Sequence, residues 1–324
     1  MEYANLDVFV LTYNRADYLK IMLESLCNQT AKGFNIKVLN NASTDNTIDI
    51  VNEIKRQYPS RNIELITHKE NIGNPNNFKK SQELAHNEYT AVFHDDDAIH
   101  PEYINTAMQL LNRHKDAVMC TGDLQALWNV TNYNFGGLEK DYFLYKKQDG
   151  VYLNLLINRP CFASNIYKTE AYKRISYHPE KYGKLHDIIF MLELNKLGEV
   201  VFIQGRCIRY RLHAGMDSNT LTTGPYPDEI INIISRIKEL NNNHKFCGQY
   251  LLYLFAKFLY DWSFLDKYLT WEAFLLDLIK TKVFTKAELF LFKNKITRFF
   301  FKNFIKFRKK HYRHIIKNKY GKRF

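Results

Sequence analysis

Three consecutive aspartates stand in the stretch AVFHDDDAIHP, where an apolar run ends shortly before Pro101. Carboxylates this close together repel each other and raise each other's pKa unless a positive charge lies among them. Aspartates also end strands and begin turns in many proteins, so an ordinary solvated turn is the alternative. Asp95, Asp96 and Asp97 therefore form either such a turn or a site that holds a cation.

The alternation of residues 6 to 122 predicts the elements that present this triplet. Four short apolar runs are typical of strands: LDVFVLTY, FNIKVLN, IELITH and YTAVFH. Segments of helical period lie between them, with apolar residues at Leu19, Met22, Leu23 and Leu26, then at Ile48, Val51, Ile54 and Tyr58, and around Phe78 to Ala85. Ser43 to Asp45 offer an N-cap for the second helix. Strands separated by helices of this length pair in parallel, which predicts an open α/β sheet covered by helices.

In a sheet of this kind, ligands bind outside the carboxyl ends of the strands. Three polar segments follow the first, second and fourth predicted strands, namely Thr12 to Arg15, Asn40 to Ser43 and His94 to Asp97. The aspartates thus fall at the edge where a ligand is expected.

The second half of the chain has a less regular pattern. Residues 123 to 183 are rich in Tyr, Phe, Asn and Gly, which predicts irregular, loop-rich structure lining a site. YGKLHDIIFMLELNKLG then predicts a helix with apolar residues at Ile188, Met191, Leu192 and Leu194 to Leu197. EVVFIQG and CIRYRLHAG predict two strands, and after Gly224 and Pro225 the pattern is helical.

The net charge of +12 is concentrated at the C-terminus. From Lys293 to Phe324 there are 13 Lys and Arg residues and no acidic residue, so the preceding 292 residues carry 33 basic and 34 acidic side chains. The five cysteines form no CxxC pair, which argues against a zinc site or a disulfide framework and favours a reducing cytosol. No signal peptide and no apolar run of about 18 residues is found, so we expect a cytoplasmic protein.

Five motifs occur in one order over residues 5 to 218: VFVLTYNRADYLKIMLESL, VLNNASTDNT, NIGNPNNF, FHDDDAIHP and LHDIIFMLELNKLGEVVFI, the last followed by YRLH. Their order and spacing resemble the inverting family 2 glycosyltransferases of the GT-A fold, of the type that assembles bacterial surface polysaccharides. The resemblance implies a nucleotide-sugar donor, with a UDP-sugar as first choice, Mn²⁺ or Mg²⁺ on its diphosphate, and a carboxylate base that activates an acceptor hydroxyl. The expected fold is an open, mostly parallel α/β sheet flanked by helices, with a C-terminal helical extension.

The resemblance assigns the first turn to the nucleotide. Thr12, Tyr13 and Asn14 match the family's nucleotide-contacting turn, in which Tyr13 stacks on the base and Arg15 lies near phosphate. Asn14 could equally cap the helix that follows, and both roles are compatible because helix N-termini attract phosphate.

The resemblance also places three asparagines at the donor. Asn71 and Asn77, within NIGNPNNF, are expected to shape the donor pocket, although ordinary loop chemistry also explains that motif. At Asn40 family members often carry an aspartate that accepts the N3 proton of uracil. An asparagine can accept and also donate, so CDP is the alternative to UDP.

The family's metal-holding motif, usually written Asp-x-Asp, fits the triplet in two registers. Asp95 and Asp97 fit it directly, whereas counting back from Pro101 places His94 at the first position and Asp96 at the second. We expect Asp95 on the ribose or the metal, and Asp96 or Asp97 as the direct ligand.

The catalytic end of the site is assigned by two further motifs. Asp187 in KLHDIIF matches the family's base, with a helix N-cap as the alternative. Arg211 and His213 in YRLH match a diphosphate clamp with a metal-binding imidazole.

The basic tail interleaves cations with aromatic and aliphatic residues. In a helix, one side would carry Phe300, Phe304, Phe307, Tyr312, Ile315 and Ile316. That composition is typical of an interfacial helix on an anionic membrane surface. We therefore expect a peripheral protein at the inner face of the cytoplasmic membrane, whose acceptor is a growing lipid-linked glycan of capsule, O-antigen or lipooligosaccharide. A solvated tail, or a tail packed on a partner, is the alternative. Nucleic acid is not expected, because the core has no recognition motif.

These assignments divide the chain into a GT-A domain, residues 1–224, and a helical C-terminal region, residues 225–324, with the basic tail at 293–324. Within the GT-A domain, residues 1–122 are the nucleotide-binding half and 123–224 the acceptor and catalytic half.

Two other functions compete with this interpretation. A nucleotidyltransferase would more often have a Gly-rich phosphate loop near the N-terminus, and LTYNRADYL contains no glycine. An inactive glycan- or membrane-binding relative would not need to hold repelling carboxylates together, so the intact aspartate triplet argues against it.

Overall fold

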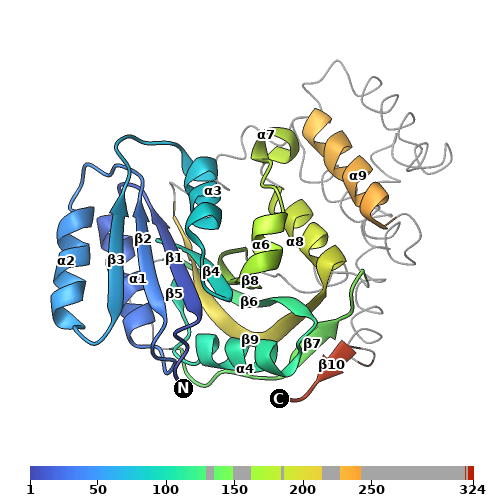
Figure 1. The fold of residues 1–324 in the computed structure, drawn as a ribbon, viewed down its shortest axis with the longest axis horizontal. Helices are drawn as coiled ribbons and strands as arrows, with labels where there is room; N and C mark the ends of the chain where they lie inside the picture. The colour runs from blue at the N-terminus through green and yellow to red at the C-terminus, as the bar shows by residue number, and fades with distance from the viewer. Residues whose placement is uncertain (129–134, 149–161, 184–185, 214–226, 242–317, 319) are drawn as a thin grey trace.

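A computed structural model describes residues 1–128, 135–148, 162–183, 186–213, 227–241, 318 and 320–324. Within these residues the chain forms a ten-stranded mixed sheet in the order β10-β7-β9-β6-β8-β4-β1-β2-β3, with β5 paired to β9 (Figure 1). Four parallel strands make up one half: β1 (Leu6–Thr12), β2 (Asn35–Asn40), β3 (Asn62–Thr67) and β4 (Tyr89–His94). They are the four predicted strands, and their parallel pairing is confirmed.

Helices follow these strands as the sequence predicts. They are α1 (Ala16–Cys27), α2 (Thr47–Gln57), α3 (Asn74–Leu84) and α4 (Tyr103–Arg113). Every residue of β1 is buried because helices cover both faces of the sheet, which explains its uninterrupted apolar run. The predicted apolar positions of α1 are buried, as are Val51 and Ile54 of α2. Ile48 is the exception, because it lies in the first turn of α2, where it stays 43% exposed.

Residues 123 to 183 are more regular than the sequence suggested. Their described part contains the end of β6 (Ala117–Trp128), β7 (Tyr142–Tyr145), the 3-10 turn η1 (Phe162–Ser164), β8 (Ile166–Lys168), α6 (Thr169–Arg174) and α7 (Pro179–Tyr182). β8 lies antiparallel between β4 and β6. The prediction of irregular structure was wrong here because strands of three or four residues are too short to show a period of two.

One long strand replaces the two that were predicted after the helix α8 (His186–Leu197). β9 (Glu199–Leu212) runs parallel to β6, with register shifts beside Gly122 and Asp123. Near its end β9 also pairs with the short strand β5 (Ala98–Ile99), and Ala98 lies opposite Arg209. β9 thereby carries the YRLH segment to the turn that follows β4.

The C-terminal region is described only at its two ends. α9 (Pro227–Asn241) agrees with the predicted helical pattern, whereas residues 242–317 and 319, with most of the basic tail, lie outside the described residues. The last residues are not helical as predicted: β10 (Gly321–Lys322) pairs antiparallel with β7. Aromatic contacts explain this, because Tyr320 is buried against Tyr145 and Phe324 lies over the Arg113 guanidinium. Among the described helices, none is long and apolar enough to cross a membrane.

Candidate active site

The carboxyl ends of β1, β2 and β4 meet at one edge of the sheet, where there is a cavity of about 360 Å³. Its wall is formed by Leu11, Thr12, Tyr13, Arg15, Asn41, Asn71, Gly73, Asn74, Asn77, His94, Asp95, Asp96 and Tyr210. The three polar segments that the sequence placed at this edge therefore meet around one cavity.

Arg15 lies between two aspartates of the triplet. Its Nη1 atom is 3.2 Å from Oδ1 of Asp95 and 3.0 Å from Oδ2 of Asp96. The backbone amide of Tyr13 donates to Oδ2 of Asp95 at 3.4 Å, and Nε2 of His213 is 3.1 Å from Oδ2 of Asp96. The positive group that adjacent carboxylates require thus comes from Arg15 in the turn after β1, and the residue after β9 brings an imidazole to the same carboxylate.

Burial raises the pKa values of two of these aspartates. Asp95 is 2% exposed and Asp97 is 1% exposed. Burial, followed by repulsion from Asp96, raises the pKa of Asp95 to about 7, although Arg15 opposes this shift. The same two causes raise the pKa of Asp97 well above its usual value, against a hydrogen bond from the Arg211 amide at 3.0 Å. If all three aspartates were ionised, the turn would carry more negative charge than its neighbours balance.

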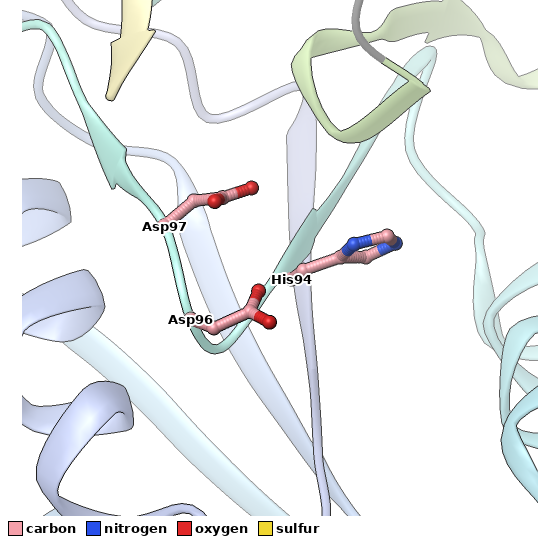
Figure 2. Close-up of side chains that lie close together, drawn as sticks. All are labelled: His94, Asp96 and Asp97. Atoms are coloured by element: carbon pink, nitrogen blue, oxygen red, sulfur yellow. The ribbon is translucent and has the colours of Figure 1, made fainter. Parts of the chain in front are cut away.

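Three potential metal ligands converge at this turn. His94, Asp96 and Asp97 each offer one ligand atom, and these atoms lie within 4.8 Å of one another (Figure 2). Oδ2 of Asp97 is buried and has no hydrogen-bond partner in the described part of the chain. Carboxylate oxygens with one imidazole suit Mn²⁺, and carboxylate oxygens suit Mg²⁺. The side chains present therefore fit a divalent cation.

This arrangement joins the two predicted aspartate ligands to His94 rather than to His213. The sequence indicated His94 only as one register of the Asp-x-Asp motif. His213 contacts Asp96 but is not part of the group of three. Its role as a metal ligand stays a prediction.

Tyr18 of α1 holds the YRLH segment in place, and sequence reasoning missed it. The guanidinium carbon of Arg211 lies 4.3 Å from the centre of the Tyr18 ring, and the His213 ring lies 5.2 Å from it. Nε of Arg211 also donates to the backbone oxygen of Asp96 at 2.8 Å, while its Nη2 has no hydrogen-bond partner among the described residues. Arg211 is buried and does not line the 360 Å³ cavity, so its contact with a diphosphate stays a prediction.

The loops after β1 and β2 fix each other. The Asn14 amide donates to Oγ of Ser43 at 2.9 Å, and Oδ1 of Asn14 accepts from the Thr44 amide at 2.7 Å. Oδ2 of Asp45 accepts from the Ala16 amide at 2.9 Å, so the first turn of α1 is held by Asp45 and not by an Asn14 cap. Asn14 has a positive φ of 51°, which asparagine tolerates better than most residues.

Two neighbouring asparagines after β2 have different environments. Asn40 is fully buried, its Oδ1 accepts from the Ser43 amide at 3.0 Å, and it is not among the residues that line the cavity. Asn41 does line the cavity, and it donates to Oδ1 of Asn71 at 2.8 Å. Asn41, and not Asn40, therefore lines this cavity, and the contact of Asn40 with a base stays a prediction.

The other two predicted donor contacts, Asn71 and Asn77, also line the cavity. Asn77 is 2% exposed, and its side chain joins α3 to β2 by donating to the Leu39 oxygen at 3.1 Å. Its Oδ1 lies 2.9 Å from Nε2 of His68. Because both ends of its amide are engaged, Asn77 shapes the wall, while Asn71 is the better placed of the two for a ligand contact.

Asp187 lies in the first turn of α8, one residue inside the helix. Its Oδ1 accepts from the Ile188 amide at 2.8 Å. Burial raises its pKa, against the charges of His186 and His94. Asp187 does not line the 360 Å³ cavity, and its role as the base stays a prediction. The segment just before it, residues 184–185, lies outside the described residues.

Comparison with known proteins identifies this architecture. A model of the family described as "Glycosyl transferase family 2" matches residues 7–176, which is more than half of the chain. The chain belongs to glycosyl transferase family 2. The matched segment contains the aspartate triplet and four of the five motifs, so the predicted family is confirmed, while LHDIIFMLELNKLGEVVFI and YRLH lie beyond residue 176.

Curated family 2 relatives match over part of their length. An uncharacterized glycosyltransferase of Haemophilus influenzae is 23% identical over 65% of this chain and 67% of its own length. The abequosyltransferase RfbV of Salmonella typhimurium is 25% identical, covering 56% of this chain and 58% of that protein. The putative glycosyltransferase EpsH of Bacillus subtilis is 32% identical, but the match spans only 34% of EpsH.

Solved structures confirm the GT-A fold. Staphylococcus aureus TarS 1-349 in complex with UDP superposes with a TM-score of 0.63 at 18% identity, over 95% of this chain and 91% of that one. The mannosyltransferase PcManGT of Pyrobaculum calidifontis, in complex with GDP-Man and Mn²⁺, gives a TM-score of 0.51 at 15% identity over 86% of each chain.

Proposed function

We propose that the protein is a metal-dependent inverting glycosyltransferase that moves a sugar from a UDP-sugar to a hydroxyl group of a growing glycan. The observation that carries this proposal is the meeting of a polar cavity with His94, Asp96 and Asp97 at the carboxyl edge of a family 2 fold. UDP is the first choice because TarS, a related fold, was solved with UDP and with UDP-GlcNAc. CDP remains the alternative, since asparagines stand at the base-contacting end of the cavity.

The donor is proposed to lie along the cavity from the asparagines to the aspartates. Asn71 would contact the base, and Tyr13 would stack on it because that side chain is 42% exposed at the rim. Asn41 would shape the wall, since Asn71 and the Ile72 amide engage both ends of its side-chain amide. Asp95 would face the ribose, and Arg15 and Arg211 would reach the diphosphate. Asp96 and Asp97, with His94 or His213, would hold Mn²⁺ or Mg²⁺, which neutralises charge on the leaving diphosphate.

Asp187 is proposed to act as the base. A carboxylate with a raised pKa accepts a proton more readily than an ordinary one, and burial gives Asp187 this property. In the reaction the acceptor O–H bond breaks, its proton goes to Asp187, and the oxygen forms a bond to the anomeric carbon. The bond from that carbon to the phosphate oxygen breaks, and the nucleoside diphosphate leaves with the electron pair. Attack opposite the leaving group inverts the anomeric centre.

The acceptor and location are proposed from the relatives and from the charge of the chain. TarS is named as a poly(ribitol-phosphate) β-N-acetylglucosaminyltransferase and RfbV as an abequosyltransferase, both bacterial. Together with the basic tail at 293–324, these names support a surface glycan, lipid-linked and assembled at the cytoplasmic face of the membrane. We retain residues 1–224 as the GT-A domain and 225–324 as an appended region.

The test begins with thermal stabilisation by UDP, CDP, GDP and dTDP, each with and without Mn²⁺. We expect a shift that needs both UDP and Mn²⁺, and Asp96→Ala should remove it. Asp187→Asn should keep the shift and lose transfer, while the exposed Asp17→Asn serves as an isosteric control with normal activity. Full transfer by Asp187→Asn would exclude Asp187 as the base, and stabilisation by no nucleotide would contradict the donor assignment.

A further inference from the structure

A second cavity, of about 540 Å³, lies at the opposite edge of the sheet. It is bordered by the segments that precede β6 and β9 and by those that follow β7 and β8. Lys168, which lines it, pairs with Tyr89 at the start of β4, whereas His94 ends the same strand. At about 3.3 Å per residue, these two places are separated by about 17 Å along β4. The cavity shares no lining residue with the donor cavity.

The charges around this second cavity are mostly positive. Five basic residues line it, namely Lys115, Lys146, Lys147, Lys168 and Arg174. They stand against three acidic residues, Asp116, Glu170 and Glu199, which leaves a net charge of +2.

The positive charge is not consumed by internal pairs. Lys146 pairs with the buried carboxylate of Glu199, and Lys168 donates to the backbone oxygen of Lys115. The side chains of Lys115, Lys147 and Arg174 are exposed, and they make no hydrogen bond or ion pair to any residue of the described chain. Like charges that gather around a hollow without acidic partners favour an anion there.

The C-terminal strand connects this cavity with the basic tail. Gly321 pairs with Phe143 and Lys322 with Tyr142, so β10 runs antiparallel to β7. Residues before Gly321 therefore approach from the end of β7 that leads into Lys146, where the Tyr320 ring lies 5.3 Å from the ring of Tyr145. In the sequence, Tyr320 directly follows the stretch from 293 to 319, which carries 11 Lys and Arg residues and no acidic residue.

We propose that the second cavity binds the phosphate group of anionic phospholipids, so that the end of the sheet opposite the donor site faces the membrane. Lys and Arg in a pocket next to a polybasic segment match the chemistry of lipid phosphates, and each basic residue near an anionic surface adds to binding. The active-site edge then points away from the bilayer, toward the distal end of a glycan that extends from it. This assignment does not depend on which sugar is transferred.

The experiment compares two double variants with equal changes of charge. One reverses two unpaired cations of the cavity, Lys115→Glu with Arg174→Glu. The control reverses two exposed cations away from that end of the sheet, Lys69→Glu just after β3 and Lys181→Glu in α7. Full-length protein is sedimented with vesicles of phosphatidylcholine alone, or with one quarter phosphatidylglycerol. Stabilisation by UDP with Mn²⁺ is recorded for each variant, which separates loss of the lipid site from failure of the proposed function.

We expect the wild type to bind phosphatidylglycerol vesicles at least tenfold more tightly than phosphatidylcholine vesicles. The cavity variant should lose at least tenfold, and the control should stay within twofold of wild type. Equal losses in both variants would overturn the proposal, because binding would then follow overall charge or the tail alone. Inorganic phosphate, titrated in the same buffer, distinguishes the sources. Saturable phosphate binding that the cavity variant loses, without any preference for phosphatidylglycerol, would assign the cavity to free phosphate and refute the lipid.

Discussion

Replacing Asp95 by asparagine should make the metal-free protein more tolerant of high pH. Burial and the charge of Asp96 raise the pKa of Asp95 to about 7, from an ordinary value of 3.8. A carboxyl whose pKa is higher in the folded state stabilises the fold below its unfolded pKa, and this contribution is lost as the pH rises through the folded pKa. Between pH 5 and pH 8 the folded state therefore loses a proton that the unfolded state has already lost.

The size of this effect follows from the shift. Each pH unit over which only the folded group is protonated changes the free energy of unfolding by about 1.4 kcal/mol, so the interval from pH 5 to about 7 gives about 3 kcal/mol. The substituted asparagine would not titrate, and the pKa of about 7 already includes the attraction of Arg15, which acts only while Asp95 is ionised. The difference in unfolding free energy, Asp95→Asn minus wild type, should therefore rise by about 3 kcal/mol from pH 5 to pH 8.

The assay is urea unfolding in the presence of EDTA, at both pH values, for wild type and variant. Asp45→Asn is the control. Burial would raise the pKa of Asp45, but the Thr47 hydroxyl and the amides of Ala16 and Thr47 lower it overall. Its contribution is present above its ordinary pKa and is lost only in acid, so its effect should be the same at pH 5 and pH 8. If Asp95→Asn also gave a constant difference, Asp95 would be ionised throughout, and Arg15 would outweigh burial.

Two further changes test how the site and the sheet are held. Tyr18→Leu should raise the KM for the donor more than it lowers kcat, because Arg211 loses its aromatic support. Tyr18→Phe keeps the aromatic ring and should restore donor affinity. Equal KM values in wild type and both variants would contradict this role of Tyr18. Asp7→Asn should cost about 3 kcal/mol of unfolding free energy, because the fully buried Asp7 carboxylate pairs with Lys37 at 2.9 Å. Lys20→Met, which breaks an exposed pair, should leave the free energy of unfolding close to that of wild type in the same denaturation assay.

The parallel half of the fold could be predicted because its physical signals are local. β1 is buried along its whole length and therefore reads as an unbroken apolar run, and helices of 11 or 12 residues follow each strand with a buried stripe. Once parallel pairing is fixed, the carboxyl ends of the strands must meet at one edge. The location of the aspartate triplet at that edge followed from these facts alone.

What could not be predicted depends on contacts between distant residues. β8 has three residues, and it forms a strand because β4 and β6 lie on either side of it. Tyr18 and Arg211 stack although 193 positions separate them, and neither position is unusual in its own segment. The choice between Asn40 and Asn41 depends on where β2 ends, because neighbouring residues of a strand point to opposite sides. A shift of one residue decides which of the two faces the cavity.

The charges at the donor site imply that nucleotide and cation bind together. When all three are ionised, Asp95, Asp96 and Asp97 outnumber Arg15 and Arg211, so a diphosphate entering alone would then meet more negative than positive charge. A divalent cation beside Oδ2 of Asp97 would reverse this balance and also give that buried oxygen a partner. Coupling of this kind is reciprocal, so the factor by which Mn²⁺ tightens UDP must equal the factor by which UDP tightens Mn²⁺. Calorimetric titrations in both orders should give one common factor well above tenfold, and UDP affinity that is unchanged by Mn²⁺ would show that the arginines alone hold the diphosphate.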